Sequence, residues 1–171
     1  GISWALQALR RVKQSGVEFE YTIAGGGPDV PRLKELATKL ELREAIIFHP
    51  GYRGDEYDRV LGNTDIFLLP SFRESLGMTC QEAIVAGALP VVADIGAQGW
   101  LVNIAGFKGA SVKSEQDLVA ELTQLILDFK NRPDQTQERV KEGAQKVSEF
   151  FSEENYITTL REVYRIVQKN H

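Results

Sequence analysis

Two glutamates flank the start of a predicted helix in the segment Leu68–Ala83. Glu74 lies in the loop after an apolar strand, and Glu82 follows on the second or third turn of the helix. The first N–H groups of a helix have no intrahelical partner and attract anions. Carboxylates accept hydrogen bonds from hydroxyl groups. The segment therefore suits an activated sugar, which offers phosphates to the helix and hydroxyls to the carboxylates.

The predicted helix opens with Gly77, Met78 and Thr79. A glycine at this point lets a diphosphate approach the backbone closely. The alternative is an ordinary polar helix start, which is common in α/β folds.

Glu82 is followed by the apolar residues Ala83 to Ala86, and burying a glutamate among them requires a partner. A ribose diol would serve, because its two hydroxyls can face both carboxylate oxygens. An ion pair with a lysine or arginine is the alternative. The spacing between Glu74 and Glu82 does not decide between these roles, since Glu154 and Glu162 have the same spacing on a predicted surface helix.

Two further loops could contribute to the same site. Gly25 and Gly26 form a sharp turn that either admits a ligand or is purely structural. Tyr52 and Arg53 could pack on a nucleobase, or could simply be exposed loop side chains. Cys80 is interpreted as core filler rather than a nucleophile.

The chain has 171 residues, a net charge of -4 and one cysteine. It is long enough for one domain with a sizeable core, and its charge does not favour nucleic acid. No segment is apolar for long enough to span a bilayer, and no cluster has metal-ligand spacing. A single cysteine fits a reducing compartment. The first residues resemble the middle of a helix and lack a signal peptide, so a fragment of a longer, cytoplasmic protein is expected.

Strands alternate with helices along the chain, which predicts an α/β fold, a three-layer α/β/α sandwich with a Rossmann-like parallel sheet. The predicted strands are 17–24, 45–48, 65–70, 89–94 and a weak 109–112. The predicted helices cover about 4–15, 33–40, a short segment after a capping Asp55, 78–86, 115–130, 134–150 and 153–168. Ligands of such sheets bind outside the carboxyl ends of the strands. Asp94, at the end of the fourth predicted strand, is expected to cap a helix.

An ordered set of motifs resembles the C-terminal domain of the family-4 (group 1) retaining glycosyltransferases, which have the two-domain GT-B fold. The matching segments are Ala24–Pro28, Leu36–Ala37, Phe48–Gly51, Thr64–Ser71, Glu74–Ala83, Ala86–Val92 and Tyr164. The family's "G-G-x-x-E" is replaced by Gly96-Ala97-Gln98-Gly99-Trp100, which leaves the contacts of that loop open.

The resemblance implies a role for each candidate residue. Glu74 would contact donor-sugar hydroxyls near the reacting carbon, and Glu82 would hold the ribose. The loop near Gly51 and Tyr52 would receive the base. Backbone groups would hold the sugar and the diphosphate at Leu76, Gly77, Met78 and Thr79.

The implied reaction transfers a sugar from a nucleotide diphosphate sugar to an acceptor with retention, in polysaccharide, glycolipid or glycoconjugate synthesis. The resemblance implies no essential metal or cofactor. It also implies that the diphosphate-binding Arg and Lys precede Gly1 and that a separate N-terminal domain binds the acceptor. That domain could make the protein membrane-peripheral. The 171 residues alone are therefore expected to bind donor weakly and to transfer little.

Residues 1–171 are predicted to form a single nucleotide-sugar-binding domain in which 153–171 is the closing helix, packed on the body of the fold. One alternative is a sugar-nucleotide epimerase of the same architecture. Another is a non-catalytic nucleotide-binding or docking module whose helices 115–168 bind a partner, which an exposed apolar stripe there would favour. That stripe consists of Ile157, Leu160, Val163, Tyr164 and Val167.

Overall fold

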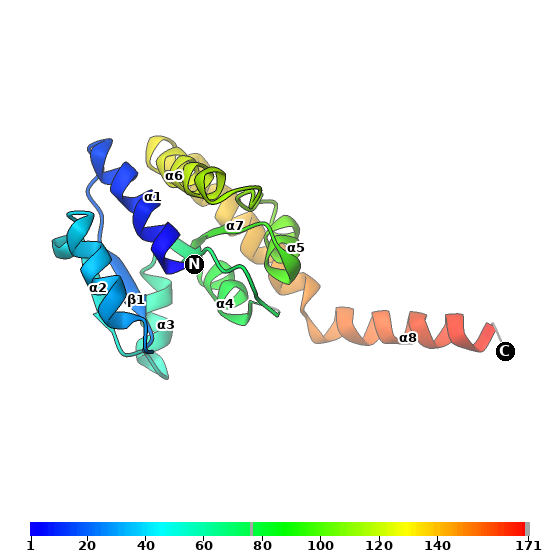
Figure 1. Ribbon diagram of the computed structural model, residues 1–171. Helices are drawn as coiled ribbons and strands as arrows, with labels where there is room; N and C mark the ends of the chain where they lie inside the picture. Colours follow the sequence, from blue (N-terminus) through cyan, green and yellow to red (C-terminus); the bar gives the residue numbers. More distant parts are fainter. Residues whose placement is uncertain (76, 170–171) are drawn as a thin grey trace.

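The computed structural model describes residues 1–75 and 77–169 (Figure 1). The helices are α1 (Ile2–Gln14), α2 (Val30–Lys39), α3 (Asp55–Gly62), α4 (Met78–Ala86), α5 (Gly96–Ile104), α6 (Glu115–Asn131), α7 (Pro133–Phe150) and α8 (Glu153–Lys169), with a 3₁₀ turn at Arg43–Ala45. The strands are β1 (Tyr21–Ala24), β2 (Ile46–His49), β3 (Ile66–Leu69) and β4 (Leu89–Val92). The α/β class predicted from the sequence is confirmed.

The described strands pair as two parallel two-stranded sheets, rather than as one continuous sheet. In one, β1 pairs with β2 so that Tyr21 lies opposite Ile46; in the other, β3 pairs with β4. All four residues of β4 are buried, as expected of a strand covered on both faces. The predicted strand 109–112 is reduced to a single bridge between Ala93 and Ala110.

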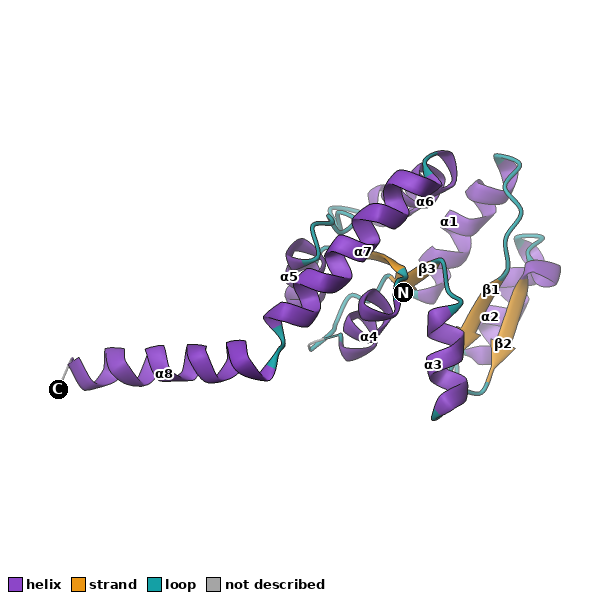
Figure 2. Cartoon of the chain, turned by 180° about the vertical axis from the view of Figure 1, so that it is seen from behind, coloured by secondary structure: helices purple, strands orange, loops and turns teal. Residues whose placement is uncertain are grey.

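The core forms around α1, which lies between α2 and α6 in both ribbon views (Figures 1 and 2). The apolar residues of α1 recur at helical spacing, so one face is fully covered. Its buried residues are Ala5, Leu6, Ala8, Leu9 and Val12. The core continues into β4, α5 and α6 through Val91, Val92, Leu101, Leu118 and Leu122.

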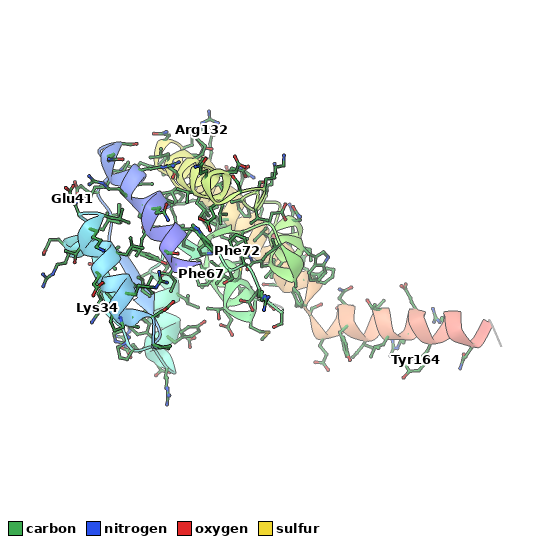
Figure 3. The ribbon with its side chains drawn as sticks, in the orientation of Figure 1. Lys34, Glu41, Phe67, Phe72, Arg132 and Tyr164 are labelled. Carbon is green, nitrogen blue, oxygen red and sulfur yellow. The ribbon has the colours of Figure 1, made fainter. Side chains whose placement is uncertain are left out.

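The last helix does not close the fold as predicted. α8 leaves the end of α7 and projects away from the body, with Tyr164 far along it (Figures 1 and 3). Tyr156 is 64% exposed and Tyr164 is 66% exposed. Ile157 and Leu160 are also exposed, while the side chains of Val163 and Val167 lie outside the described part. The described residues of the stripe are thus exposed rather than packed on the body of the fold. None of the helices described is long and apolar enough to cross a membrane.

Candidate functional site

The loop after β3 lies against the start of α1. A Cβ atom at Gly1 would overlap the carbonyl oxygen of Pro70, directly after β3. The Trp4 ring lies 4.4 Å, centroid to centroid, from that of Phe72, the residue labelled beside the start of α1 in Figure 3. The N–H of Gly25 donates to the carbonyl of His49 at 2.8 Å, which joins the ends of β1 and β2. The carboxyl ends of the strands are where a doubly wound fold binds its ligands.

The start of α4 is an open helix N-terminus. Gly77 is the N-cap residue in the left-handed conformation (φ 70°, ψ 45°), which glycine adopts without strain, and no side chain caps the helix. The first intrahelical bonds run from the amides of Cys80 and Gln81 to the carbonyl of Gly77. Among the described residues the amides of Met78 and Thr79 have no acceptor, and amides at such a helix start can bind an anion.

Glu74 stands beside this helix start and is half-buried. The N–H of Ser75 donates to its Oε1 at 3.2 Å. A Cβ at Gly77 would lie 3.6 Å from the Glu74 Cγ, so the carboxylate belongs to the same small region as the amides at the helix start. Burial, and secondarily the Glu74 charge, raise the pKa of the Cys80 thiol to about 12. Cys80 is fully buried, which agrees with its interpretation as core filler.

Glu82 is exposed, contrary to the expectation that its apolar neighbours would bury it. It shares an outward face of α4 with Met78 and Val85, which are 57% and 48% exposed, while Cys80 and Ile84 face the core. Because α4 is short and apolar on both sides, the sequence did not reveal which face was covered.

The partner of Glu82 is a tyrosine, not a lysine or arginine. The hydroxyl of Tyr57, in the first turn of α3, donates to Glu82 Oε2 at 2.5 Å. No ion pair of Glu82 occurs among the described residues. The two residues lie 25 positions apart, and no local pattern marks Tyr57. Only the packing of α3 against α4 identifies it.

The proposed base loop contains a preformed aromatic pair. The rings of His49 and Tyr52 stack with centroids 3.9 Å apart and planes 9° apart. The N–H of Gly51 donates to His49 Nδ1 at 3.2 Å, which fixes the ring against its own loop. Arg53 is exposed and has no recorded contact among the described residues, while Gly25 and Gly26 face open space. A base could therefore stack on a rigid surface rather than on a free tyrosine.

Gln98 was missed by sequence reasoning, although it is fully buried. Its Nε2 donates to the carbonyl of Ser71 at 3.0 Å and to that of Ala93 at 2.7 Å. Its Cβ also lies 3.6 Å from the position a Gly77 Cβ would occupy. It thus ties the Glu74 loop to the end of β4. A glutamine between glycines at a strand end was the available signal.

The fourth strand end differs from the prediction. The N-cap of α5 is Ile95 and no side chain caps the helix, so the predicted cap by Asp94 is wrong. Asp94 instead packs against Gly99 and Gly109, where added Cβ atoms would clash with it. Asp55 is likewise a helical residue, since α3 is capped by Gly54 without a side-chain bond.

The structure therefore gathers Glu74, Gly77, Met78 and Thr79 at one helix start, with Glu82 on the second turn of the same helix. Gly25, Gly26, Tyr52 and Arg53 lie on the loops after β1 and β2. Leu76, also predicted to contact the sugar, lies outside the described residues. Among the described residues no group of three or more His, Cys, Asp or Glu side chains could hold a metal ion.

A family model described as "Glycosyl transferases group 1" matches residues 1–147, and the chain belongs to that family. The chain is 33% identical over 118 residues to the putative colanic acid biosynthesis glycosyltransferase WcaL of Salmonella typhimurium, covering 60% of this chain and 29% of that protein. It is 26% identical over 147 residues to the 2-deoxystreptamine glucosyltransferase of Streptomyces kanamyceticus, covering 86% of this chain and 37% of that protein.

Solved structures agree on the fold. A glycosyltransferase from Rickettsia africae ESF-5 superposes with a TM-score of 0.75 at 19% identity, over 98% of this chain and 45% of that one. The pneumococcal O-GlcNAc transferase GtfA, in complex with UDP and GlcNAc, gives 0.70 at 19% identity, over 97% and 33%. The GT-B-type Rossmann-like fold is thereby confirmed. The chain spans less than half the length of each of these four proteins.

Proposed function

We propose that this chain binds a nucleotide diphosphate sugar and forms the donor half of a retaining glycosyltransferase. The observation that carries the proposal is the uncapped start of α4, where the amides of Met78 and Thr79, which have no acceptor among the described residues, lie beside Glu74. Helix amides at this position match a diphosphate, the group on which negative charge develops as the sugar leaves.

In this proposal each part of the donor binds a different group at the carboxyl ends of the strands. The diphosphate binds the amides of Met78 and Thr79, and the sugar hydroxyls bind Glu74. The ribose binds Glu82, and the base stacks at Tyr52. Retention of the anomeric configuration rests on the likeness of residues 74–83 to the pattern of retaining enzymes.

The acceptor would bind a second domain outside this chain, as the shorter span relative to the relatives suggests. Saccharide, glycolipid or glycoconjugate acceptors are all included in the proposal. We propose that no metal is required, because the amides of α4 supply the positive potential, so turnover should survive a chelator such as EDTA. A cytoplasmic site of action fits the buried free thiol of Cys80.

The named relatives favour sugar transfer over epimerisation. WcaL and the 2-deoxystreptamine enzyme are both named as transferases, one putatively in colanic acid biosynthesis. A purely docking module is also less well supported, because it gives the open helix N-terminus no role.

A thermal-shift screen of the 171-residue chain with UDP, GDP, ADP and their sugar conjugates tests the proposal. A ligand that binds only the native state stabilises it by about 2.7 kcal/mol at a concentration of 100 Kd. We expect the nucleotides of one base to raise Tm clearly more than those of the other two bases. If millimolar concentrations of all three leave Tm unchanged, the proposal of a donor-binding site is wrong.

A further inference from the structure

The contact between Tyr57 and Glu82 lies where α3 meets α4. The Tyr57 ring is half-buried and packs on a small apolar cluster formed by Leu61, Ala83 and Ala88. The ring is therefore fixed by packing, and the hydroxyl extends from it to the Glu82 carboxylate.

This contact leaves Glu82 with one engaged oxygen. Oε2 accepts from Tyr57 at 2.5 Å, and Oε1 has no recorded partner among the described residues. Glu82 is exposed, so without the contact its long side chain would sample several rotamers. A hydrogen bond to an ionised carboxylate is stronger than one between neutral groups.

The protonated state of the Tyr57 phenol keeps the contact in place. Burial, followed by the hydrogen bond to Glu82, raises the pKa of Tyr57 to about 12. The phenol thus remains a donor at any pH near neutrality.

We infer that Tyr57 is a positioning residue that holds Glu82 with Oε1 turned toward the ribose diol of the donor. This inference rests on the proposed function. Because Tyr57 already donates to Oε2, Oε1 is the oxygen turned to the diol, and its two lone pairs can accept from both hydroxyls. Tyr57 thereby makes the site selective for nucleotides with an intact ribose.

A purely structural role makes a different prediction. If the contact only ties α3 to α4, its loss would lower stability and would affect all nucleotides equally. The decisive quantity is therefore the preference for a ribonucleotide over its 2′,3′-dideoxy counterpart, which lacks both hydroxyls.

Calorimetry on the 171-residue chain can measure this preference with UDP, GDP and ADP, each paired with its 2′,3′-dideoxy form. The variant Tyr57→Phe keeps the ring in its cluster and removes only the hydroxyl. We expect it to weaken ribonucleotide binding about five- to tenfold and to change dideoxynucleotide binding less than twofold. The double variant with Glu82→Gln should bind no more weakly than Glu82→Gln alone, because both act on one contact.

Tyr156→Phe is the matched control, since Tyr156 is 64% exposed on α8. It should leave both affinities unchanged. Equal losses for the two nucleotide forms, or no loss, would overturn the inference while the proposed function stands. So would wild-type binding without any preference for ribose. Failure of the wild type to bind either form would instead overturn the proposed function, and this inference with it.

Discussion

The buried amide of Gln98 donates to the carbonyl oxygen of Ser71 at 3.0 Å, across 27 positions of the chain. The same nitrogen also donates to the carbonyl of Ala93 at 2.7 Å. One side chain thus holds the loop that carries Glu74 against the end of β4. The geometry of the candidate site depends on this buried amide as much as on the residues that would contact a ligand.

Replacing Gln98 should therefore destabilise the domain. Gln98→Leu keeps most of the volume but removes the donor of the Ser71 carbonyl and one of the two donors of the Ala93 carbonyl, which keeps the N–H of Ile95 at 2.9 Å. A buried polar group left unpaired costs about 1–3 kcal/mol. We expect a loss of about 1–3 kcal/mol in urea denaturation, from the one carbonyl left unpaired. Gln145→Ala is the control, because Gln145 is exposed on α7 and its side chain donates to Glu149, one turn away on the same helix. It should change stability by less than about 0.5 kcal/mol. Wild-type stability of Gln98→Leu would contradict the bridging role.

Removing the carboxylate of Glu82 should weaken nucleotide binding. Glu82→Ala deletes the proposed ribose acceptor, and hydrogen bonds to charged groups are worth enough to lower affinity about tenfold. Calorimetry with the nucleoside diphosphate selected by the thermal-shift screen measures the change. Glu162→Ala, on the projecting α8, is the control and should bind normally. An affinity of Glu82→Ala equal to that of the wild type would remove the ribose role.

Glu74 should matter for turnover rather than for nucleotide affinity. In an active protein that contains this domain, Glu74→Gln loses the carboxylate beside the reacting sugar but keeps the volume and one acceptor oxygen. We expect turnover to fall about a hundredfold or more while nucleoside diphosphate affinity changes less than twofold. Steady-state kinetics and calorimetry on the same preparation separate the two quantities. Near-normal turnover would exclude the proposed contact.

The thiol of Cys80 should be unreactive in the native protein. Burial first, and the charge of Glu74 second, raise its pKa to about 12. The thiolate, which is the reactive form, should therefore be scarce even at pH 9. We expect Ellman's reagent to modify the folded protein slowly across pH 7–9 and to react at once after unfolding in guanidinium. Rapid stoichiometric reaction of the native protein would show that this part of α4 opens readily.

The raised pKa of Cys80 also makes the stability of the domain fall at high pH. A thiol whose pKa is higher in the folded state stabilises that state fully at any pH below the pKa of the unfolded chain, which is near 9. This stabilisation is lost as the pH rises toward the folded-state pKa of about 12. The stability of the wild type should thus fall more steeply above pH 9 than that of Cys80→Ala, as measured by urea denaturation at each pH.

The sequence by itself determined the order of β1 to β4 and of the described helices except α5, the placement of Glu74 and Gly77 at a helix start, and the family. These features are local, because apolar periodicity and glycine positions act between neighbours along the chain. The tertiary structure alone decided the exposure of Glu82, its contact with Tyr57, the bridge made by Gln98 and the outward course of α8. Those features depend on which helix faces cover one another, and segments 25 or more positions apart carry no mutual signal until packing brings them together.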